Sequence, residues 1–410
     1  MKREAKDEEG PAMKAVPGGV TAARGFKASG VRCGLKEQGE DLALVFSEAP
    51  AAVAGMFTTN RFRAAAVQVS QERAGRGAAQ AVVINSGNAN ACTGETGLRH
   101  AREMTEIAAL LLGIKPELVL VCSTGVIGRP LPMDRVQDGI HAAVKALSAE
   151  GGGAAARAIM TTDTAPKEAA VEFEVGGKRV RLGGMAKGAG MIAPSLATLI
   201  CVLTTDAAVP LDSLDLSLRW AVERSFNCIT VDGDMSTNDT VLLLANGASG
   251  APQVRDEKAT RAFEAALEQV TSTLARALVA DGEGATKLIE VRVQGTHDYE
   301  TARKIAMRIA NSPLVKTALF GQDPNWGRIL AAAGGAGVEF DPRQVRLSLG
   351  RHEIVRGGEP TEADPEALRK ALQPREVTIA LTVGDGPHGA TVWTCDLTYD
   401  YVRINAEYHT

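Results

Sequence analysis

MAKGAGMIAPSLATLICVLTTDA, residues 185–207, is the most informative segment of the chain. In it a loop of small residues leads directly into an apolar strand rich in β-branched side chains, and Thr198 stands at the junction. Such a loop delivers a hydroxyl group to the start of a rigid strand, where a nucleophile can be held. An ordinary buried strand threonine fits the same pattern, so the spacing alone leaves both interpretations open.

The first interpretation has a definite chemistry. If the Thr198 hydroxyl attacks the carbonyl carbon of Ala197, an ester replaces the amide, and water then frees a new chain that begins at Thr198. The new α-amino group has a pKa of roughly 8, so it can accept the hydroxyl proton at neutral pH without a histidine. The six histidines lie in no recognisable Ser/His/Asp or metal-binding setting, which agrees with this mechanism.

Strand, turn and helix patterns surround this segment. AQAVVINSGNANACTG (79–94) and ELVLVCSTGVIGRP (117–130) each predict a strand that runs into a glycine-rich turn, and an amphipathic helix follows each turn. Helices are predicted near 211–226, 256–281 and 301–312, whereas GGGAAARA (151–158) is typical of a flexible segment. The last third alternates again, with strands in VTIALTVG and ATVWTCDLTYDYV joined by a DGPHG hairpin turn.

These patterns predict an α/β (α+β) protein. We expect a layered αββα-type sandwich with a self-processed threonine nucleophile, together with a smaller C-terminal α+β unit. The expected division is a disordered charged leader over 1–18, a catalytic domain over 19–285, and a C-terminal domain over 286–410 whose last residues return to the active site.

Composition excludes several classes of protein. The net charge of -4 arises from 45 basic and 49 acidic residues without a basic stripe, so nucleic acid is not an expected partner. The six cysteines are widely spaced and do not form the pairs that zinc sites use. No apolar run approaches the roughly 20 residues that span a bilayer, and the first residues lack a signal peptide, so we expect a cytoplasmic protein away from membranes.

Eight motifs together resemble one family. They extend across almost the whole chain: NSGNANACTG, STGVIG, IMTTDT, KGAGMIAPSLAT, FNCITVDGDMSTNDT, DGEGATKLIEV, GQDPNWGRI and the terminal INAEYHT. In this order they look like the ornithine acetyltransferases, also called the bifunctional glutamate N-acetyltransferase or ArgJ family. That resemblance favours the nucleophile over the ordinary strand threonine.

The resemblance implies the reaction and its residues. Cleavage falls between Ala197 and Thr198, and Thr198 then carries the acetyl group from N-acetylornithine to glutamate in a ping-pong reaction of arginine biosynthesis, which yields ornithine and N-acetylglutamate. The hydroxyl of Thr124 and the backbone N–H of Gly125 match the oxyanion hole. The substrate-binding positions carried over from the family are Thr161, Lys187, Thr198, Glu283, Asn405 and Thr410.

The resemblance also implies an assembly and its cofactors. Chains 1–197 and 198–410 of one precursor are expected to stay together and to form a dimer of such pairs, a heterotetramer. Neither a metal nor an organic cofactor is implied, and acetyl-CoA as a further donor is left open. NSGNANACTG and VDGDMSTNDT are interpreted as structural turns, and Trp326 as a packing anchor.

Two other functions fit the sequence. A self-processed N-terminal-nucleophile amidase or aminopeptidase would use the same kind of nucleophile and pass the acyl group to water. A non-catalytic binding protein would keep the fold without cutting the chain. The acceptor dependence of turnover separates the first alternative from a transferase, and the intact mass of the purified protein separates the second.

Overall fold

The computed structural model describes residues 13–193 and 199–407. Within these residues nine strands form one sheet in the order β1-β6-β7-β8-β9-β3-β4-β5, and β2 pairs with β3. The strands are β1 (Lys14–Ala15), β2 (Phe26–Val31), β3 (Leu42–Phe57), β4 (Ala78–Asn88), β5 (Val119–Val126), β6 (Lys167–Val175), β7 (Lys178–Lys187), β8 (Ile200–Thr205) and β9 (Thr240–Ala245).

The long strand β3 makes this sheet fold over itself. One part of β3 pairs with β4 and another with β9, and the register with β4 shifts between Phe46 and Ala51. The two halves therefore face each other across a shared core, to which β8 contributes Ile200 and Val202 and β4 contributes Ile84. Successive strand residues point to opposite faces, so the remaining apolar positions of each half are turned outward.

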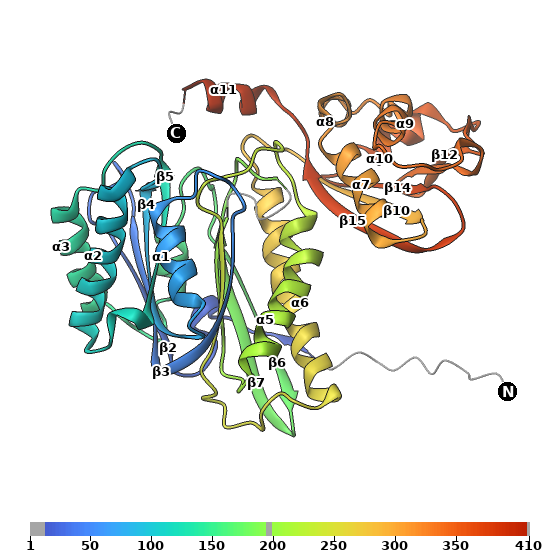
Figure 1. Ribbon diagram of the computed structural model, residues 1–410. Coiled ribbons are helices and arrows are strands. Elements are labelled where there is room, and N and C mark those ends of the chain that lie inside the picture. The colour runs from blue at the N-terminus through green and yellow to red at the C-terminus, as the bar shows by residue number, and fades with distance from the viewer. Residues whose placement is uncertain (1–12, 194–198, 408–410) are drawn as a thin grey trace.

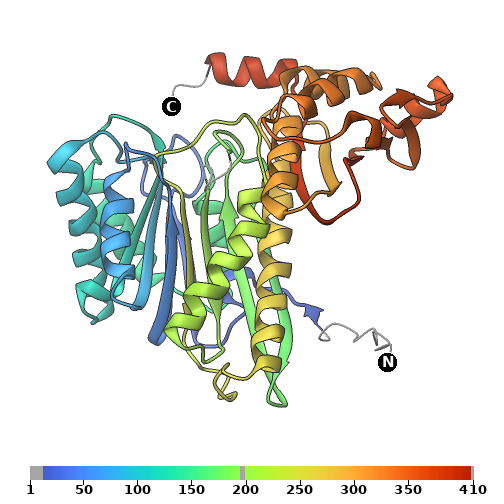
Figure 2. The same ribbon diagram turned by 45° about the vertical axis from the view of Figure 1, so that its right-hand side comes forward.

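Helices cover both outward faces. The described helices of this part are α1 (Ala65–Ala74), α2 (Gly94–Leu112), α3 (Met133–Lys145), α4 (Gly152–Ala158), α5 (Leu211–Arg224) and α6 (Glu257–Ala280). Cys201 and Leu203 of β8 pack with α5 and α6, while Ala81 and Val83 of β4 pack with α1, α2 and α3. Figures 1 and 2 show the two groups of helices on opposite sides of the strands. The predicted mixed α/β sandwich is confirmed, with its layers in the order α, β, β, α.

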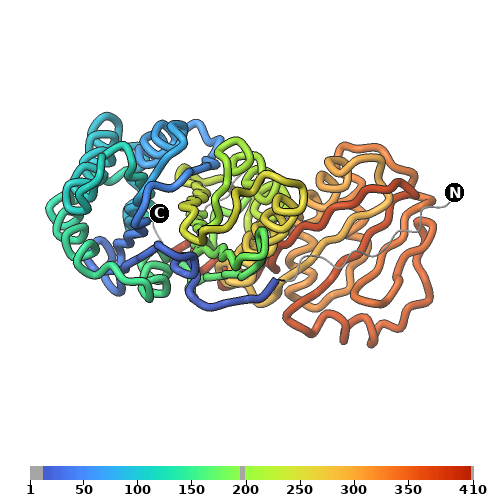
Figure 3. The backbone as a smooth tube through the Cα atoms, turned by 90° about the horizontal axis from the view of Figure 1, so that it is seen from below, coloured from blue at the N-terminus to red at the C-terminus, as the bar shows by residue number. Residues whose placement is uncertain are grey.

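A second, six-stranded sheet follows α6. Its order is β13-β12-β11-β14-β10-β15. Its strands are β10 (Leu288–Gly295), β11 (Arg346–Leu349), β12 (His352–Arg356), β13 (Glu359–Pro360), β14 (Glu376–Thr382) and β15 (Gly386–Cys395), and its helices are α7 (Tyr299–Ala310), α8 (Pro313–Phe320), α9 (Trp326–Gly334) and α10 (Pro365–Ala371). Ile289 and Val291 of β10 pack with Ile305 of α7, and Trp326 packs against this core. Figure 3 shows the second sheet beside the first unit rather than stacked on it.

The predicted hairpin between the last two strands is wrong. β14 and β15 do not pair with each other, because β10 lies between them and pairs with β14 in parallel and with β15 in antiparallel fashion. A glycine-rich turn reverses the chain but does not choose the partner strand. The apolar strand β10 takes the position between them, where strands on both sides satisfy its backbone groups.

Two segments that were predicted to be disordered or flexible are ordered. Lys14 and Ala15, inside the predicted leader, form β1, which pairs antiparallel with β6. Residues 1–12 of that leader lie outside the described residues. The glycine-rich segment after residue 150 forms α4, where Ala155 and Ala156 are buried in the core between the two halves of the sheet. Small side chains there permit close packing, which composition alone does not distinguish from flexibility.

The chain ends in a helix that returns toward the first sheet. The sequence predicted a strand through residue 402, but β15 ends at Cys395 and α11 (Tyr399–Glu407) follows. Figures 1 and 2 show α11 leaving the second unit and crossing above the first. The Tyr401 hydroxyl donates to Asp232 Oδ2 at 3.3 Å, which ties the helix to the loop before β9. No helix of the described residues is long and apolar enough to cross a membrane.

Candidate active site

A small cavity gathers the predicted site residues that the structure describes. Its volume is about 90 Å³, and it lies where β5, β7 and the segment before β9 end at one edge of the first sheet. The predicted residues that line it are Thr124, Gly125, Thr161, Lys187, Glu283 and Asn405. These positions span 282 residues of sequence, so only the fold brings them together. Ala197, Thr198 and Thr410 lie outside the described residues.

Lys187 is the cation of this cavity. It is the last residue of β7 and is 2% exposed. Its Nζ donates to Thr161 Oγ1 at 2.7 Å and to Thr124 Oγ1 at 3.4 Å, so one ammonium group links two predicted site hydroxyls. Burial lowers the pKa of Lys187, whereas the nearby carboxylates, Asp163 foremost, raise it.

Asp163 anchors Lys187 and Thr161. Its Oδ2 accepts the Thr161 N–H at 3.0 Å and lies 3.9 Å from Lys187 Nζ, while its Oδ1 accepts the Gly188 N–H at 2.7 Å. Burial alone would raise the pKa of this carboxyl, but Lys187, Lys167 and the Gly188 N–H lower it to about 2. Asp163 is therefore ionised at neutral pH and faces the ammonium group of Lys187 at the cavity wall.

A second ion pair extends this buried network away from the cavity. Lys167 Nζ lies 2.6 Å from Asp163 Oδ1 and 2.6 Å from Asp281 Oδ2. Asp281, which ends α6, also accepts the Thr164 N–H at 3.0 Å. Each buried charge thus faces an opposite one, the condition under which charges are tolerated in a protein interior.

Only glycine fits at position 125. Its φ is +128°, a region that side chains rarely adopt. A Cβ atom there would lie 2.3 Å from the carbonyl carbon of Gly87 and 2.5 Å from the nitrogen of Asn88. Close approach of β4 to β5 therefore requires glycine, and it exposes the backbone beside Thr124 to the cavity.

The far wall combines a carboxylate with the C-terminal helix. Glu283 follows α6, and its Oε2 accepts a hydrogen bond from Asn405 Nδ2 of α11 at 2.8 Å. Its backbone N–H donates to Ala189 O at 2.9 Å, which ties it to the loop after β7. A Cβ on Gly190 would lie 2.5 Å from the Glu283 carboxyl carbon, so that glycine leaves the space the carboxylate occupies.

The strand that begins at the cavity edge is flanked by a cation and an acid. In the register of the sheet, Ile200 of β8 lies beside Lys187 on β7 and beside Thr240 on β9. Leu199, just before β8, donates its N–H to Asp239 Oδ1 at 3.1 Å. Burial raises the pKa of Asp239 well above its ordinary value, although the Leu199 N–H and the more distant Lys187 lower it.

We compared the chain with models of known protein families. The ArgJ family model matches residues 27–410, which is nearly the whole chain. The chain belongs to the ArgJ family. The resemblance drawn from eight sequence motifs is therefore confirmed.

Individual proteins of the ArgJ family are similar to this chain over most of its length. The arginine biosynthesis bifunctional protein ArgJ of Symbiobacterium thermophilum is 54% identical over 402 residues, covering 97% of this chain and 100% of that protein. The protein of the same name from Parasynechococcus marenigrum is 50% identical over 398 residues, 96% of each chain. The crystal structure of Mycobacterium tuberculosis ornithine acetyltransferase complexed with ornithine is 41% identical, covering 46% of this chain and 100% of that one, with a TM-score of 0.42.

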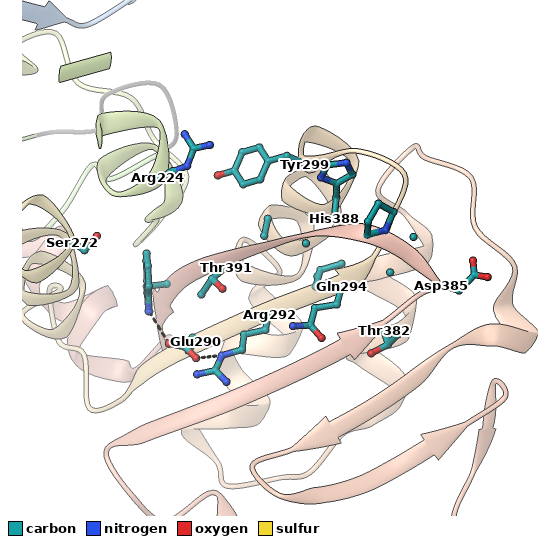
Figure 4. A pocket seen from close by; sticks show the side chains of 18 of the residues that line it. Arg224, Ser272, Glu290, Arg292, Gln294, Tyr299, Thr382, Asp385, His388 and Thr391 are labelled. Carbon is teal, nitrogen blue, oxygen red and sulfur yellow. Dashed lines mark hydrogen bonds and ion pairs between the residues drawn. The ribbon is translucent and has the colours of Figure 1, made fainter. Parts of the chain in front are cut away.

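A larger cavity lies elsewhere, along β10 and β15 of the second sheet (Figure 4). Its volume is about 900 Å³, and none of the predicted site residues lines it. Glu290 pairs there with Arg292 and accepts the Trp393 indole N–H at 3.1 Å, while Arg224 lies 5.8 Å from the ring centre of Tyr299. Because none of the predicted site residues lines this cavity, we assign it no part in the proposed acetyl transfer.

Sequence reasoning missed part of the cavity wall. VDGDMSTNDT was interpreted as a structural turn, yet Ser236, Thr237 and Asn238 line the cavity. Asn238 also has a structural task, because its Nδ2 donates to Ala89 O and Ser123 O at 2.7 Å each. Asp163 was missed although it lies two residues after Thr161 in IMTTDT. The described part of the chain holds no cluster of three or more His, Cys, Asp or Glu side chains suited to a metal ion.

Proposed function

We propose that this chain is a glutamate N-acetyltransferase that cuts itself between Ala197 and Thr198. It then moves the acetyl group of N-acetylornithine to glutamate through an acetyl ester on Thr198. Membership of the ArgJ family supports the reaction, since the relatives are named arginine biosynthesis bifunctional protein ArgJ and a related structure is an ornithine acetyltransferase complexed with ornithine. The observation that carries the residue roles is the shared cavity of Thr124, Gly125, Lys187 and Glu283.

In the first half-reaction the Thr198 hydroxyl attacks the acetyl carbonyl carbon of N-acetylornithine. Its proton passes to the free α-amino group of Thr198, the C–N bond of the amide breaks, and ornithine leaves with that proton on its nitrogen. The attack places a negative charge on the acetyl oxygen. The Thr124 hydroxyl and the Gly125 N–H are the donors that we assign to this oxygen, and one such donor is typically worth about 3–4 kcal/mol in the transition state.

In the second half-reaction the amine of glutamate attacks the acetyl ester, and the Thr198 oxygen leaves and regains a proton. Both amino acids share an α-carboxylate, for which Lys187, with Thr161 beside it, is the cationic partner. Glu283 is the partner of the side-chain ammonium of ornithine, and Asn405 holds its carboxylate. Thr410 is kept as a binding residue from the family pattern alone.

The proposal also covers the assembly of the enzyme, its location in the cell and its acetyl donors. The groups named above, with the two substrates, are sufficient for the reaction without a cofactor. Chains 1–197 and 198–410 act as one unit, two such units form a dimer, and the enzyme works in the cytoplasm with the other enzymes of amino-acid synthesis. The relatives are named as bifunctional proteins, so we propose acetyl-CoA as a second donor that acetylates the same threonine.

An acceptor assay tests the function. The enzyme is supplied with N-acetylornithine, with or without glutamate, and ornithine, N-acetylglutamate and free acetate are measured. A transferase forms ornithine and N-acetylglutamate in equal amounts, at a rate that depends on glutamate. Release of acetate at a rate independent of glutamate would show a hydrolase instead. Replacing N-acetylornithine by acetyl-CoA in the same assay decides whether the second donor is used.

A further inference from the structure

The side chain of Asn238 is hydrogen-bonded to the main chain of two neighbouring strand ends. It lies just before β9, lines the small cavity and is 5% exposed. Its Nδ2 donates to Ser123 O of β5 and to Ala89 O, directly after β4, at 2.7 Å each, and its Oδ1 accepts the hydroxyl of Thr237. Both hydrogens of the amide are used within the protein, so it has no donor left for a substrate.

The bond to Ser123 acts on the two groups that we assign to the oxyanion. The carbonyl of Ser123 and the nitrogen of Thr124 belong to one planar peptide group. The N–H of Gly125 belongs to the next peptide group, and only the φ and ψ angles of Thr124 separate the two planes. A shift of the Ser123 carbonyl therefore moves the Thr124 side chain and the Gly125 N–H together.

The bond to Ala89 holds the other side of Gly125. The N–H of Ala89 donates to Val126 O at 3.0 Å, while the carbonyl of the same residue accepts from Asn238. Gly125 thus lies between Ser123, which Asn238 holds directly, and Val126, which it holds through Ala89. Glycine has the widest choice of backbone angles, so its φ of +128° stays fixed only if the flanking peptide groups are held.

We propose, on the basis of the proposed acetyl transfer, that Asn238 is a positioning residue for the oxyanion hole. It keeps the Thr124 hydroxyl and the Gly125 N–H directed at the place where the acetyl oxygen becomes negative. Donors fixed in advance stabilise this charge without having to turn toward it during the reaction. Acetylation and deacetylation of Thr198 both form such an oxyanion, so both half-reactions depend on Asn238.

The proposed cleavage gives this contact a further consequence. Asn238 would belong to the fragment 198–410, whereas Ser123 and Ala89 would belong to the fragment 1–197. One fragment would then supply the oxyanion hole and the other would hold it in shape.

Two substitutions test the role. Asn238→Ala removes both N–H donors, and Asn238→Asp keeps the shape and the acceptor for Thr237 without the amide hydrogens. We expect kcat of each variant to fall about 10- to 100-fold, the scale expected when donors to an oxyanion are misplaced. KM for N-acetylornithine and for glutamate should stay within about twofold, because an interaction made only in the transition state lowers kcat and kcat/KM equally.

Ser70→Ala is the matched control. Ser70 of α1 is fully buried, and its hydroxyl donates to Val121 O at 2.6 Å and accepts the Val121 N–H at 2.8 Å. Val121 lies on β5 two residues before Ser123. Ser70→Ala therefore also removes two buried hydrogen bonds to the main chain, but away from the cavity. We expect it to lower the melting temperature about as much as Asn238→Ala and to leave kcat unchanged.

The assay counts only cut enzyme. Intact mass gives the fraction of each preparation that is still the 42.9 kDa chain, and kcat is calculated per cut molecule. Steady-state kinetics with varied N-acetylornithine and glutamate give kcat and both KM values. Thermal melting of the same preparations reports stability.

Three results would overturn the proposal. An equal loss of kcat in Ser70→Ala would assign the effect to stability. A raised KM with an unchanged kcat would make Asn238 a substrate-binding residue. If neither Asn238 variant is cut, the residue serves folding or self-cleavage instead of the transfer.

Failure of the proposed function would give a different result. The wild type would then release acetate from N-acetylornithine at a rate independent of glutamate. A loss of kcat confined to the Asn238 variants would still show the positioning role in that hydrolysis.

Discussion

At the scale of single residues, the cavity depends on charges that the protein interior holds in place. Lys187 is buried, and a buried ammonium group loses its proton more easily than an exposed one. Asp163 counters this loss, and Lys167 in turn balances Asp163. The cation that we propose as the partner of a substrate carboxylate is thus the end of a buried chain of alternating charges.

The first prediction concerns that cation. Lys187→Met keeps the length of the side chain but removes the donor to a carboxylate, and a hydrogen bond to a charged group is worth about 1.5–3 kcal/mol. We expect kcat/KM for N-acetylornithine to fall roughly 10- to 150-fold. Steady-state kinetics measure this.

Lys178→Met is the control for Lys187→Met. Lys178 begins β7, the strand that Lys187 ends, and its Nζ donates to Gly250 O on the exposed surface. It should leave kcat/KM unchanged. Equal losses in the two variants would mean that any lysine of β7 matters and that Lys187 has no special role.

At the scale of elements, α11 closes the cavity without contributing to the core. None of its described residues is buried, yet Asn405 lines the cavity and binds Glu283. Tyr399 stacks edge-on against Phe320 of α8 with ring centres 5.6 Å apart, which holds the start of the helix to the second unit. We therefore expect the helix to affect the proposed substrate site more than the stability of the fold.

The second prediction follows for α11. Asn405→Ala removes the donor to Glu283 and should raise KM for ornithine-based substrates roughly tenfold, as expected for one hydrogen bond to a charged group. The melting temperature should stay within about 2 °C of the wild type, because no buried contact is lost. Kinetics and calorimetry check both statements.

Val402→Ala is the matching variant on the same helix. Val402 is 62% exposed and lines neither cavity. It should change neither KM nor melting temperature. A large drop in melting temperature for Asn405→Ala would instead make α11 part of the folded core and contradict its assigned role.

The elements also show how far the sequence could be interpreted. The helix α3 was predictable from its regular apolar period, and the strand β8 from its short continuous run of apolar and β-branched residues. The place of β10 between β14 and β15 was not predictable, since strand order depends on contacts between distant segments that no local pattern encodes. Lys187 and Thr124 were found through family motifs, whereas Asp163 and Asn238 become visible only when burial and hydrogen-bond partners are known.

At the scale of the whole molecule, the proposed cleavage separates two strands that pair with each other. β8 would belong to the chain that begins at residue 198, and its neighbour β7 to the chain that ends at 197. The core between β8 and α6 also contains Val180 and Leu182 of β7. Cutting one peptide bond removes neither the strand pairing nor this core.

The third prediction is therefore that the two fragments remain associated. After cleavage they should elute together in size exclusion, at a mass of at least 42.9 kDa, until denaturant unfolds the sheet. Two independent peaks in native buffer would contradict the shared sheet. The same elution volume, with light scattering, measures whether two such pairs form the proposed dimer.

The fourth prediction concerns stability at low pH. The pKa of Asp163 is lowered from 3.8 to about 2 in the folded protein, so its contribution is complete above pH 4 and is lost as pH falls toward 2. The shift corresponds to about 2 kcal/mol. Urea unfolding from pH 5 to 2, in a Thr198→Ala background that is expected to stay a single chain, measures the loss.

Asp163→Asn in the same background is the comparison. Its free energy of unfolding should be lower at pH 5, because a buried charge network has lost one member, and it should fall less between pH 4 and 2. Parallel pH curves for the two proteins would show that Asp163 is not the group that titrates.

The most direct test of the whole account is the mass of the fragment that begins at residue 198. The purified enzyme is mixed with N-acetylornithine alone, quenched in acid, and analysed by intact mass and peptide sequencing. The account predicts a fragment 198–410 that is one acetyl group heavier, modified on Thr198, and returned to its original mass when glutamate is added. An uncut chain, or turnover with the acetyl group on another residue or on none, would contradict it.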